Sequence, residues 1–194
     1  MSIILNNICK QYGDNIVLDH FSFTFKDNKS YCIMAPSGQG KTTLLHILMG
    51  LVEADSGNIS GLDQYVIAPV FQENRLCENL SVGTNIKMVS REKISSQKIT
   101  TLLDQFLLPS SLRKTVRTLS GGMKRRVALA RALCSQGNLF LFDEPFKGLD
   151  ISTKEAVMHI VKKNFEGKTA IWVSHDPDEA EFMGSEIVRL GGTA

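Results

Sequence analysis

Apolar side chains recur along the chain at two different spacings, and these spacings predict its strands and helices. Phe21, Phe23 and Phe25 alternate with small polar residues, which is typical of a strand with one buried face. In residues 99–106 the apolar side chains instead recur at helical intervals, which predicts an amphipathic helix. The chain is therefore expected to combine strands with helices.

Short apolar runs and helix-forming stretches alternate along the rest of the chain. Further strands are predicted at residues 30–34, 139–142, 170–173 and 186–190, and helices at 42–51, 123–134 and 151–165. The stretches Ser56-Gly57-Asn58 and Ser60-Gly61 indicate turns. Strands that alternate with helices are typical of an α/β fold with a largely parallel sheet. Residues 73–117 show helices with little strand signal, which predicts a helical subdomain inserted into that core.

Composition and charge limit the kinds of partner that the protein can have. The 194 residues are 43% hydrophobic and 22% charged, as in ordinary soluble domains, and the net charge of +2 is too small to indicate a nucleic-acid partner. The four cysteines are far apart in the sequence, as expected in a reducing compartment. No apolar run reaches the roughly 18 residues of a membrane helix. We therefore expect a cytoplasmic protein.

A glycine-containing loop follows the strand predicted at residues 30–34. Its spacing fits the phosphate-binding pattern G-x-x-x-x-G-K-[ST], with Ala35 in place of the first glycine. Glycines let backbone N–H groups point at phosphate oxygens, and the helix that follows adds its positive end. Lys41 would bring a charge to the phosphates and Thr42 a hydroxyl to Mg²⁺. We therefore expect this loop to bind ATP with Mg²⁺ through Ala35, Pro36, Ser37, Gly38, Gln39, Gly40, Lys41, Thr42 and Thr43.

Two acidic residues, Asp143 and Glu144, end the strand predicted at residues 139–142. In α/β folds, ligands bind at the carboxyl ends of the strands. Asp143 is expected to hold Mg²⁺, directly or through water, because this ion takes oxygen ligands. Glu144 is the candidate general base for an attacking water molecule. Taken alone, the pair could equally be solvated turn acids before Pro145, and the phosphate loop favours the catalytic interpretation.

A third motif, Leu119-Ser120-Gly121-Gly122-Met123, precedes the helix predicted at residues 123–134. Together with the phosphate loop and the acid pair, in this order, it resembles the ATP-binding cassette (ABC) ATPases, whose signature reads L-S-G-G-Q. The resemblance extends from Ile3 to Leu190. It implies a phosphate-loop NTPase fold of the ABC type, with a mostly parallel core sheet and a small antiparallel β subdomain. The whole chain, residues 1–194, would be one nucleotide-binding domain with the helical subdomain at about 73–117.

The resemblance implies roles for residues outside the phosphate loop. Tyr12 matches the aromatic residue that stacks on adenine. Ser120, Gly121 and Gly122 match the signature that binds the γ-phosphate of an ATP molecule held by a second subunit. Residues 148–150 match a loop that passes between the two subunits. Each ATP site would therefore be built from two chains.

Three residues are the candidate catalytic set under the same resemblance. Gln72 matches a residue that senses Mg²⁺ and the attacking water, and His175 matches a histidine that contacts the γ-phosphate. The catalytic candidates are therefore Glu144, His175 and Gln72, and the metal candidates are Thr42, Gln72 and Asp143.

Each of these assignments competes with an ordinary structural role. Tyr12 could be an exposed edge aromatic, Ser120 a helix N-cap, and His175 a surface or core histidine. The basic run Lys124-Arg125-Arg126 is interpreted as the exposed face of the signature helix. Met123 replaces the glutamine of the family signature and cannot make its polar contact.

The complete motif set resembles the ATP-hydrolysing subunit of an ABC transporter. This implies a homodimer or heterodimer, integral membrane permease subunits as partners, a place on the cytoplasmic face of the membrane, and, for an importer, a solute-binding protein. Residues 71–76 and 174–176 are similar to importers of nitrate, sulfonate and taurine. Two other functions stay open: a soluble ABC ATPase that acts on DNA or ribosomes, and a phosphate-loop kinase of small molecules. The first lacks its expected second cassette or coiled coil here, and the second has no use for the signature.

Overall fold

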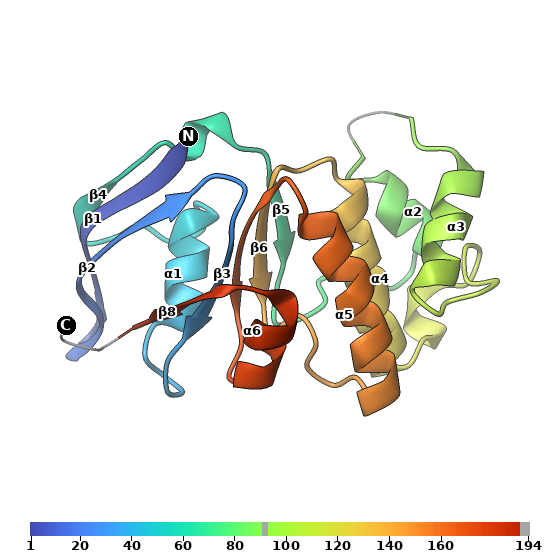
Figure 1. Ribbon diagram of the computed structural model, residues 1–194. Coiled ribbons are helices and arrows are strands. Elements are labelled where there is room, and N and C mark those ends of the chain that lie inside the picture. Colours follow the sequence, from blue (N-terminus) through green and yellow to red (C-terminus); the bar gives the residue numbers. More distant parts are fainter. Residues whose placement is uncertain (91–92, 191–194) are drawn as a thin grey trace.

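The computed structural model describes residues 1–90 and 93–190 and contains two sheets (Figure 1). The larger sheet has the strand order β5-β6-β7-β3-β8, and all four of its pairings are parallel. Its strands are Ile67–Val70 (β5), Leu139–Asp143 (β6), Thr169–Val173 (β7), Ser30–Met34 (β3) and Glu186–Arg189 (β8). The predicted parallel core is confirmed, and the carboxyl ends of these strands share one edge.

The smaller sheet is antiparallel, with the order β2-β1-β4. Its strands are Asn15–Lys26 (β2), Ser2–Tyr12 (β1) and Ser56–Ser60 (β4). The turn predicted at Ser56-Gly57-Asn58 is wrong, because these residues pair with β1. Gly57 has φ +96°, and a Cβ there would lie 2.4 Å from the carbonyl oxygen of Asn7. Glycine is therefore needed for a close approach of two backbones, which in sequence resembles a turn signal.

The described part of the chain contains six helices: Lys41–Leu48 (α1), Val82–Lys87 (α2), Ser96–Gln105 (α3), Gly121–Cys134 (α4), Ile151–Phe165 (α5) and Pro177–Met183 (α6). Short 3₁₀ turns lie at Leu62–Gln64 and Val116–Thr118. The predicted helices are confirmed with small shifts at their ends. Helix α1 ends before Gly50, which has φ +69°, and α4 begins at Gly121 because the Ser120 side chain caps it.

Alternate side chains of β6 divide the apolar core into two parts. Leu139 and Leu141 pack with α1 and the antiparallel sheet. Phe140 and Phe142 pack with residues of α4, α5 and α6 on the other face. The parallel sheet therefore forms a middle layer, with α1 on one side and α4, α5 and α6 on the other (Figure 1). This arrangement explains why every residue of β6 and β7 is buried.

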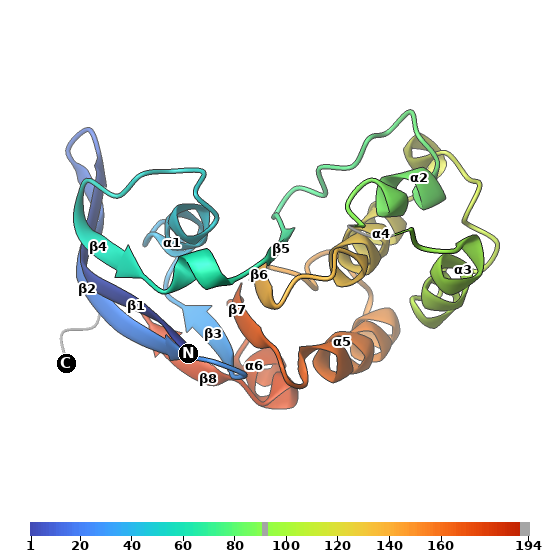
Figure 2. The ribbon, with the colours of Figure 1, turned by 90° about the horizontal axis from the view of Figure 1, so that it is seen from above.

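Helices α2 and α3 lie beyond α4, at the end of the molecule farthest from the antiparallel sheet (Figure 2). Buried residues such as Val82, Ile99 and Phe106 attach them to α4 through the same apolar cluster that contains Val127. Residues 91 and 92 of the segment predicted as helical, and residues 191–194 of the predicted domain, lie outside the described residues. Within the described ranges, no helix combines the length and apolarity needed to cross a membrane.

Candidate functional site

The predicted phosphate loop connects β3 to α1 at the carboxyl edge of the parallel sheet. Gly38 has φ +82° and Gly40 has φ +74°, a region that residues with a Cβ adopt only at a cost. A Cβ on Gly40 would also lie 2.2 Å from the carbonyl oxygen of Val17 in β2. Glycine at this position is therefore required both by the backbone angle and by the contact with β2.

Lys41, the first residue of α1, folds back over the loop. Its Nζ donates to the carbonyl oxygen of Ala35 at 2.5 Å and to that of Pro36 at 2.9 Å. The side chain therefore bridges the two ends of the loop and holds a positive charge at its opening.

The loop is joined to β6 by a hydrogen bond in which Thr42 Oγ1 donates to Asp143 Oδ2 at 2.8 Å. Asp143 is 2% exposed, and burial raises the pKa of its carboxyl, an effect that the Thr42 hydroxyl partly opposes. A hydroxyl and a carboxylate, brought together by two elements, are the oxygen donors that Mg²⁺ takes in phosphate sites. These residues therefore fit that ion.

Glu144 follows Asp143 and has φ +45°, a left-handed conformation that is uncommon for this residue type. Its Oε2 lies 2.6 Å from the Nζ of Lys147, and its Oε1 lies 3.5 Å from Nδ1 of His175. Burial acts to raise the pKa of Glu144, but the Lys147 ammonium and His175 outweigh it and hold this pKa below its ordinary value. The carboxylate is therefore ionised, and a cation partly covers it.

His175 lies two residues beyond the end of β7, and its side chain is largely exposed. It lines the same pocket of about 610 Å³ as the first part of the phosphate loop. The lining residues are Met34, Ala35, Pro36, Ser37, Gln39, His175, Arg189 and Leu190. The structure thus brings the loop and His175 to one cavity, with Glu144 beside His175.

Gln72 lies two residues beyond the end of β5, as Glu144 follows the neighbouring β6. The register Val70↔Phe142 places the two residues at the same level beyond adjacent strands. The Gln72 side chain is exposed and makes no hydrogen bond to Thr42, Asp143 or Glu144. Gln72 therefore lies at the correct edge of the sheet without a direct contact to the other candidates.

The signature residues lie away from the phosphate loop of the same chain. Ser120 caps α4, and its Oγ accepts a hydrogen bond from the backbone N–H of Met123 at 3.3 Å. Gly121 has open space around it, and a Cβ on Gly122 would lie 3.5 Å from the carbonyl oxygen of Gly148. No hydrogen bond within residues 1–90 and 93–190 joins these three residues to the loop. The exposed N-terminus of α4 is therefore free for another molecule.

Tyr12 is the last residue of β1 and is 50% exposed. The Nζ of Lys10 lies 5.5 Å from the centre of its ring. Tyr12 pairs with Asn15 in the same β-hairpin whose Val17 touches Gly40. Its ring is accessible on the sheet that supports the phosphate loop.

The structure corrects the interpretation of the basic run at the start of α4. Arg125 was expected on an exposed face, but it is only 4% exposed. Its guanidinium donates to backbone carbonyl oxygens that lie at the ends of β5 and β6, those of Phe71, Gln72, Asp143, Glu144 and Pro145. Burial lowers the pKa of Arg125 to about 10, which still leaves it charged at neutral pH. Arg125 thus fixes the backbone that carries three of the predicted site residues.

Two more residues with a part in the site were missed from the sequence. Arg131, six residues after Arg125 on α4, donates to the carbonyl oxygens of Asn74 and Arg75. Lys147 forms the ion pair with Glu144, three residues away. Lys147 could have been found from the sequence, because it is a cation three residues from a predicted catalytic acid. Arg125 and Arg131 could not, because their hydrogen-bond partners are distant in sequence.

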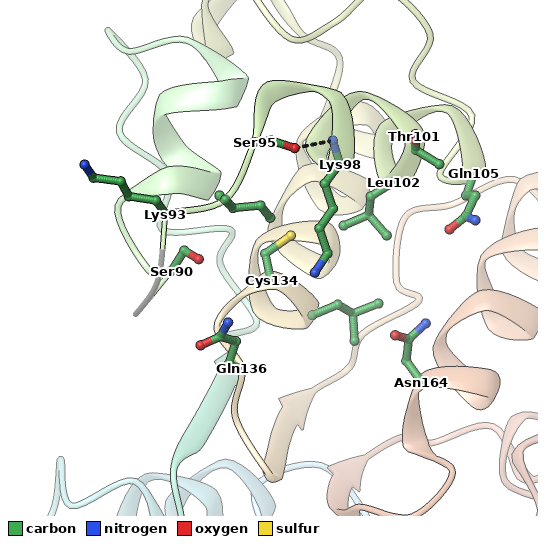
Figure 3. A pocket seen from close by; sticks show the side chains of 12 residues that line it. Ser90, Lys93, Ser95, Lys98, Thr101, Leu102, Gln105, Cys134, Gln136 and Asn164 are labelled. Atoms are coloured by element: carbon green, nitrogen blue, oxygen red, sulfur yellow. Dashed lines mark hydrogen bonds between the residues drawn. The ribbon is translucent and has the colours of Figure 1, made fainter.

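A second cavity, of about 530 Å³, lies between α3 and the end of α4 (Figure 3). Its lining includes Lys98, Cys134 and Asn164, and it contains none of the residues predicted for the site. The phosphate-loop pocket is therefore the candidate site.

The chain as a whole is similar to the members of one protein family. The family described as "ABC transporter" matches residues 18–147, more than half of the chain. A solved structure described as the dimeric, post-hydrolysis state of the ATP-binding cassette MJ0796 bound to ADP and Pi has a TM-score of 0.84 and 30% sequence identity. The match covers 97% of this chain and 94% of that chain.

Curated relatives give the same result. The sn-glycerol-3-phosphate import ATP-binding protein UgpC of Ruegeria pomeroyi is 35% identical over 98% of this chain. The sulfate/thiosulfate import ATP-binding protein CysA of Synechocystis sp. is 34% identical, also over 98% of this chain. The chain spans 59% and 58% of the lengths of these two relatives.

Proposed function

Because this chain belongs to the ABC transporter family of ATP-binding proteins, we propose that it binds and hydrolyses ATP to drive the transport of a solute across a membrane. The observation that carries the proposal is the Thr42–Asp143 hydrogen bond of 2.8 Å, which joins the phosphate loop to the last residue of β6, directly before Glu144. An enzyme that hydrolyses ATP needs the phosphate loop, Asp143 and Glu144 in one place. A loop that only connected a strand to a helix would not need to contact these acids.

ATP binding is assigned to the phosphate loop, residues 35–43. Its backbone N–H groups and the N-terminus of α1 would receive the phosphates, and Lys41 would exchange the carbonyl oxygens of Ala35 and Pro36 for phosphate oxygens. Thr42 and Asp143 would hold Mg²⁺, with Gln72 reaching it when the site closes. Mg²⁺, when bound, supplies positive charge that stabilises the phosphate oxygens. Tyr12 would stack on the adenine ring.

Hydrolysis is assigned to Glu144, with His175 and Gln72 as its helpers. The ionised Glu144 carboxylate would orient and accept a proton from the attacking water. His175, which is 3.5 Å from Glu144 and shares the pocket with the loop, would contact the γ-phosphate. Lys147 must leave Glu144, at least in part, before that carboxylate can hold a water molecule.

We propose that the site is completed by a second subunit. Ser120, Gly121 and Gly122 present a capped, exposed helix N-terminus and make no hydrogen bond to their own phosphate loop. Such a helix end is suited to bind the γ-phosphate of ATP on a partner. Two chains, identical or not, would meet head to tail with an ATP molecule at each of two interfaces.

The membrane partners are proposed from the relatives. UgpC and CysA are described as import ATP-binding proteins, so we propose that this chain works at the cytoplasmic face of a membrane with permease subunits, in an importer that also uses a solute-binding protein. The narrower group of nitrate, sulfonate and taurine importers stays a prediction from residues 71–76 and 174–176, since these two relatives are described for other cargoes. The helical segment at 73–117 is the proposed contact with the permease.

Replacement of Lys41 by alanine tests the nucleotide site. The variant should lose most of its affinity for Mg-ATP, measured by the fluorescence of a labelled nucleotide, while its urea unfolding midpoint stays close to that of the wild type. Unchanged affinity would contradict the assignment of the loop. Lys163→Ala is the matched control, because it removes an exposed ammonium of α5 that has no part in the loop or in the pairing of Glu144, and this variant should bind ATP normally.

A further inference from the structure

A β-bulge in the antiparallel sheet brings three potential metal ligands together, away from the phosphate loop. Between the pairs Ile8↔Phe21 and Lys10↔Leu18, Cys9 of β1 stands opposite two residues of β2, Asp19 and His20. A bulge of this kind turns side chains that would alternate between faces toward the same side. Cys9, Asp19 and His20 accordingly gather on the outer face of the sheet.

The three side chains are close enough to share one ion. One ligand atom from each residue, the Cys9 sulfur, an imidazole nitrogen of His20 and a carboxylate oxygen of Asp19, lies within 4.8 Å of the other two. The backbone N–H of His20 donates to Cys9 Sγ at 3.3 Å. Nδ1 of His20 lies 2.6 Å from Asp19 Oδ1. This contact holds the imidazole and the carboxylate side by side next to the Cys9 sulfur.

The backbone is strained at this place. His20 has φ +47°, although the bulge buries neither its side chain nor that of Asp19, which are 73% and 75% exposed. A left-handed backbone is uncommon for a residue that has a Cβ, and such conformations are concentrated at functional positions. The side chains of the two residues are not buried, and the bulge brings them close to Cys9.

From this geometry we propose that Cys9, Asp19 and His20 form a surface site for a divalent transition-metal ion of the Zn²⁺ type. Sulfur, imidazole nitrogen and carboxylate oxygen are the donors that Zn²⁺ takes, with water in the fourth position of a tetrahedron. Binding replaces the thiol proton of Cys9 with the ion and releases that proton to solvent. Mg²⁺, which takes oxygen ligands, does not compete for this donor set.

The site is separate from the proposed nucleotide site but connected to it. Val17, two residues before Asp19, places its carbonyl oxygen against Gly40 of the phosphate loop. A metal ion would join β1 to β2 next to this contact. The bound ion should therefore stabilise the sheet that supports the loop.

Zn²⁺ titration of tag-free, chelator-treated protein without nucleotide tests the proposal, with competition against a chromophoric chelator as the readout. The wild type should bind one ion per chain. Cys9→Ser and His20→Asn should each weaken binding at least tenfold, and asparagine is chosen because it tolerates the left-handed backbone at position 20. Equal affinity of the wild type and both variants would overturn the proposal.

Two control variants separate this site from others. Cys77→Ser removes an exposed cysteine elsewhere, and Asp143→Asn alters the proposed Mg²⁺ site, so both should bind Zn²⁺ like the wild type. Loss of binding in either control to the same extent as in Cys9→Ser would contradict the assignment. If Asp143→Asn loses ATP binding, it should still bind Zn²⁺. The proposed Zn²⁺ site and the proposed nucleotide site can therefore be refuted separately.

Co²⁺ provides a readout that does not depend on affinity. Ligation by a thiolate gives Co²⁺ an intense near-ultraviolet charge-transfer band, which the wild type should show and Cys9→Ser should lack. Urea unfolding of metal-free protein shows whether the variants fold. A Co²⁺ complex without this band in the folded wild type would overturn the role of Cys9.

Discussion

Arg125 gives the sharpest test of how the site is held together. Its guanidinium is 4% exposed and donates to five backbone carbonyl oxygens, which belong to Phe71, Gln72, Asp143, Glu144 and Pro145. Replacement by methionine keeps much of the volume of the side chain but removes every donor. The carbonyl groups would then be buried without this partner. We therefore expect Arg125→Met to destabilise the fold and to displace the residues that follow β5 and β6.

The loss of unfolding free energy in Arg125→Met follows from two opposing contributions. Hydrogen bonds from a charged donor contribute about 1.5–3 kcal/mol each, and five of them would exceed the total stability of many domains if they were simply added. Burying a guanidinium costs several kcal/mol, which offsets much of that sum. The net loss expected on breaking such a buried set is about 3–5 kcal/mol.

Urea unfolding followed by circular dichroism measures this loss. With a slope of about 2–3 kcal/mol/M, the midpoint should fall by about 1–2.5 M. Lys124→Met, one position earlier on the same helix, is the control. It removes an ion pair to the half-exposed Glu78 and should cost at most about 1 kcal/mol. A midpoint for Arg125→Met no lower than that of Lys124→Met would refute the proposed role of the guanidinium.

Two further predictions concern the phosphate loop and the general base. Gly40→Ala should lose more stability and more ATP affinity than Gly38→Ala. Both positions have positive φ, but only a Cβ at Gly40 would collide with the carbonyl oxygen of Val17, at 2.2 Å. Equal losses of the two variants in urea unfolding and nucleotide titration would contradict this reasoning. The strain common to both variants is about 1–3 kcal/mol. Lys147→Met removes a cation that holds the pKa of Glu144 down in the free enzyme, so this pKa should rise, and the acid limb of the pH profile of kcat/KM, which reports the free enzyme, should move to higher pH. An unmoved limb would contradict the assignment of that limb to a Glu144 carboxylate paired with Lys147.

The fold could be predicted largely from local patterns, because most of its elements have one. The strand β6 and the helix α5 are visible as an apolar run and a helical repeat. Strand β4 was missed because Gly57, which it needs for the close approach of Asn7, has the same sequence appearance as a turn glycine.

The site residues also differ in whether a local sequence pattern reveals them. The phosphate loop and the pair Asp143-Glu144 are contiguous motifs, so their types and spacing indicate a nucleotide site directly. The role of Arg125 depends on carbonyl groups that lie 18 to 54 positions away in sequence. In a single sequence, a basic run at the start of a helix looks the same whether it is solvated or buried. The structure was needed to place Arg125 in the interior.

The central claim, that the chain hydrolyses ATP between two subunits with Glu144 as the base, can be tested in one measurement on Glu144→Gln. Light scattering coupled to size-exclusion chromatography should show this variant as a monomer without nucleotide and as a dimer with Mg-ATP, because ATP binds but is not consumed. Its rate of phosphate release should be at least tenfold below that of the wild type. A variant that stays monomeric while it binds ATP, or that hydrolyses ATP at the wild-type rate, would contradict the account.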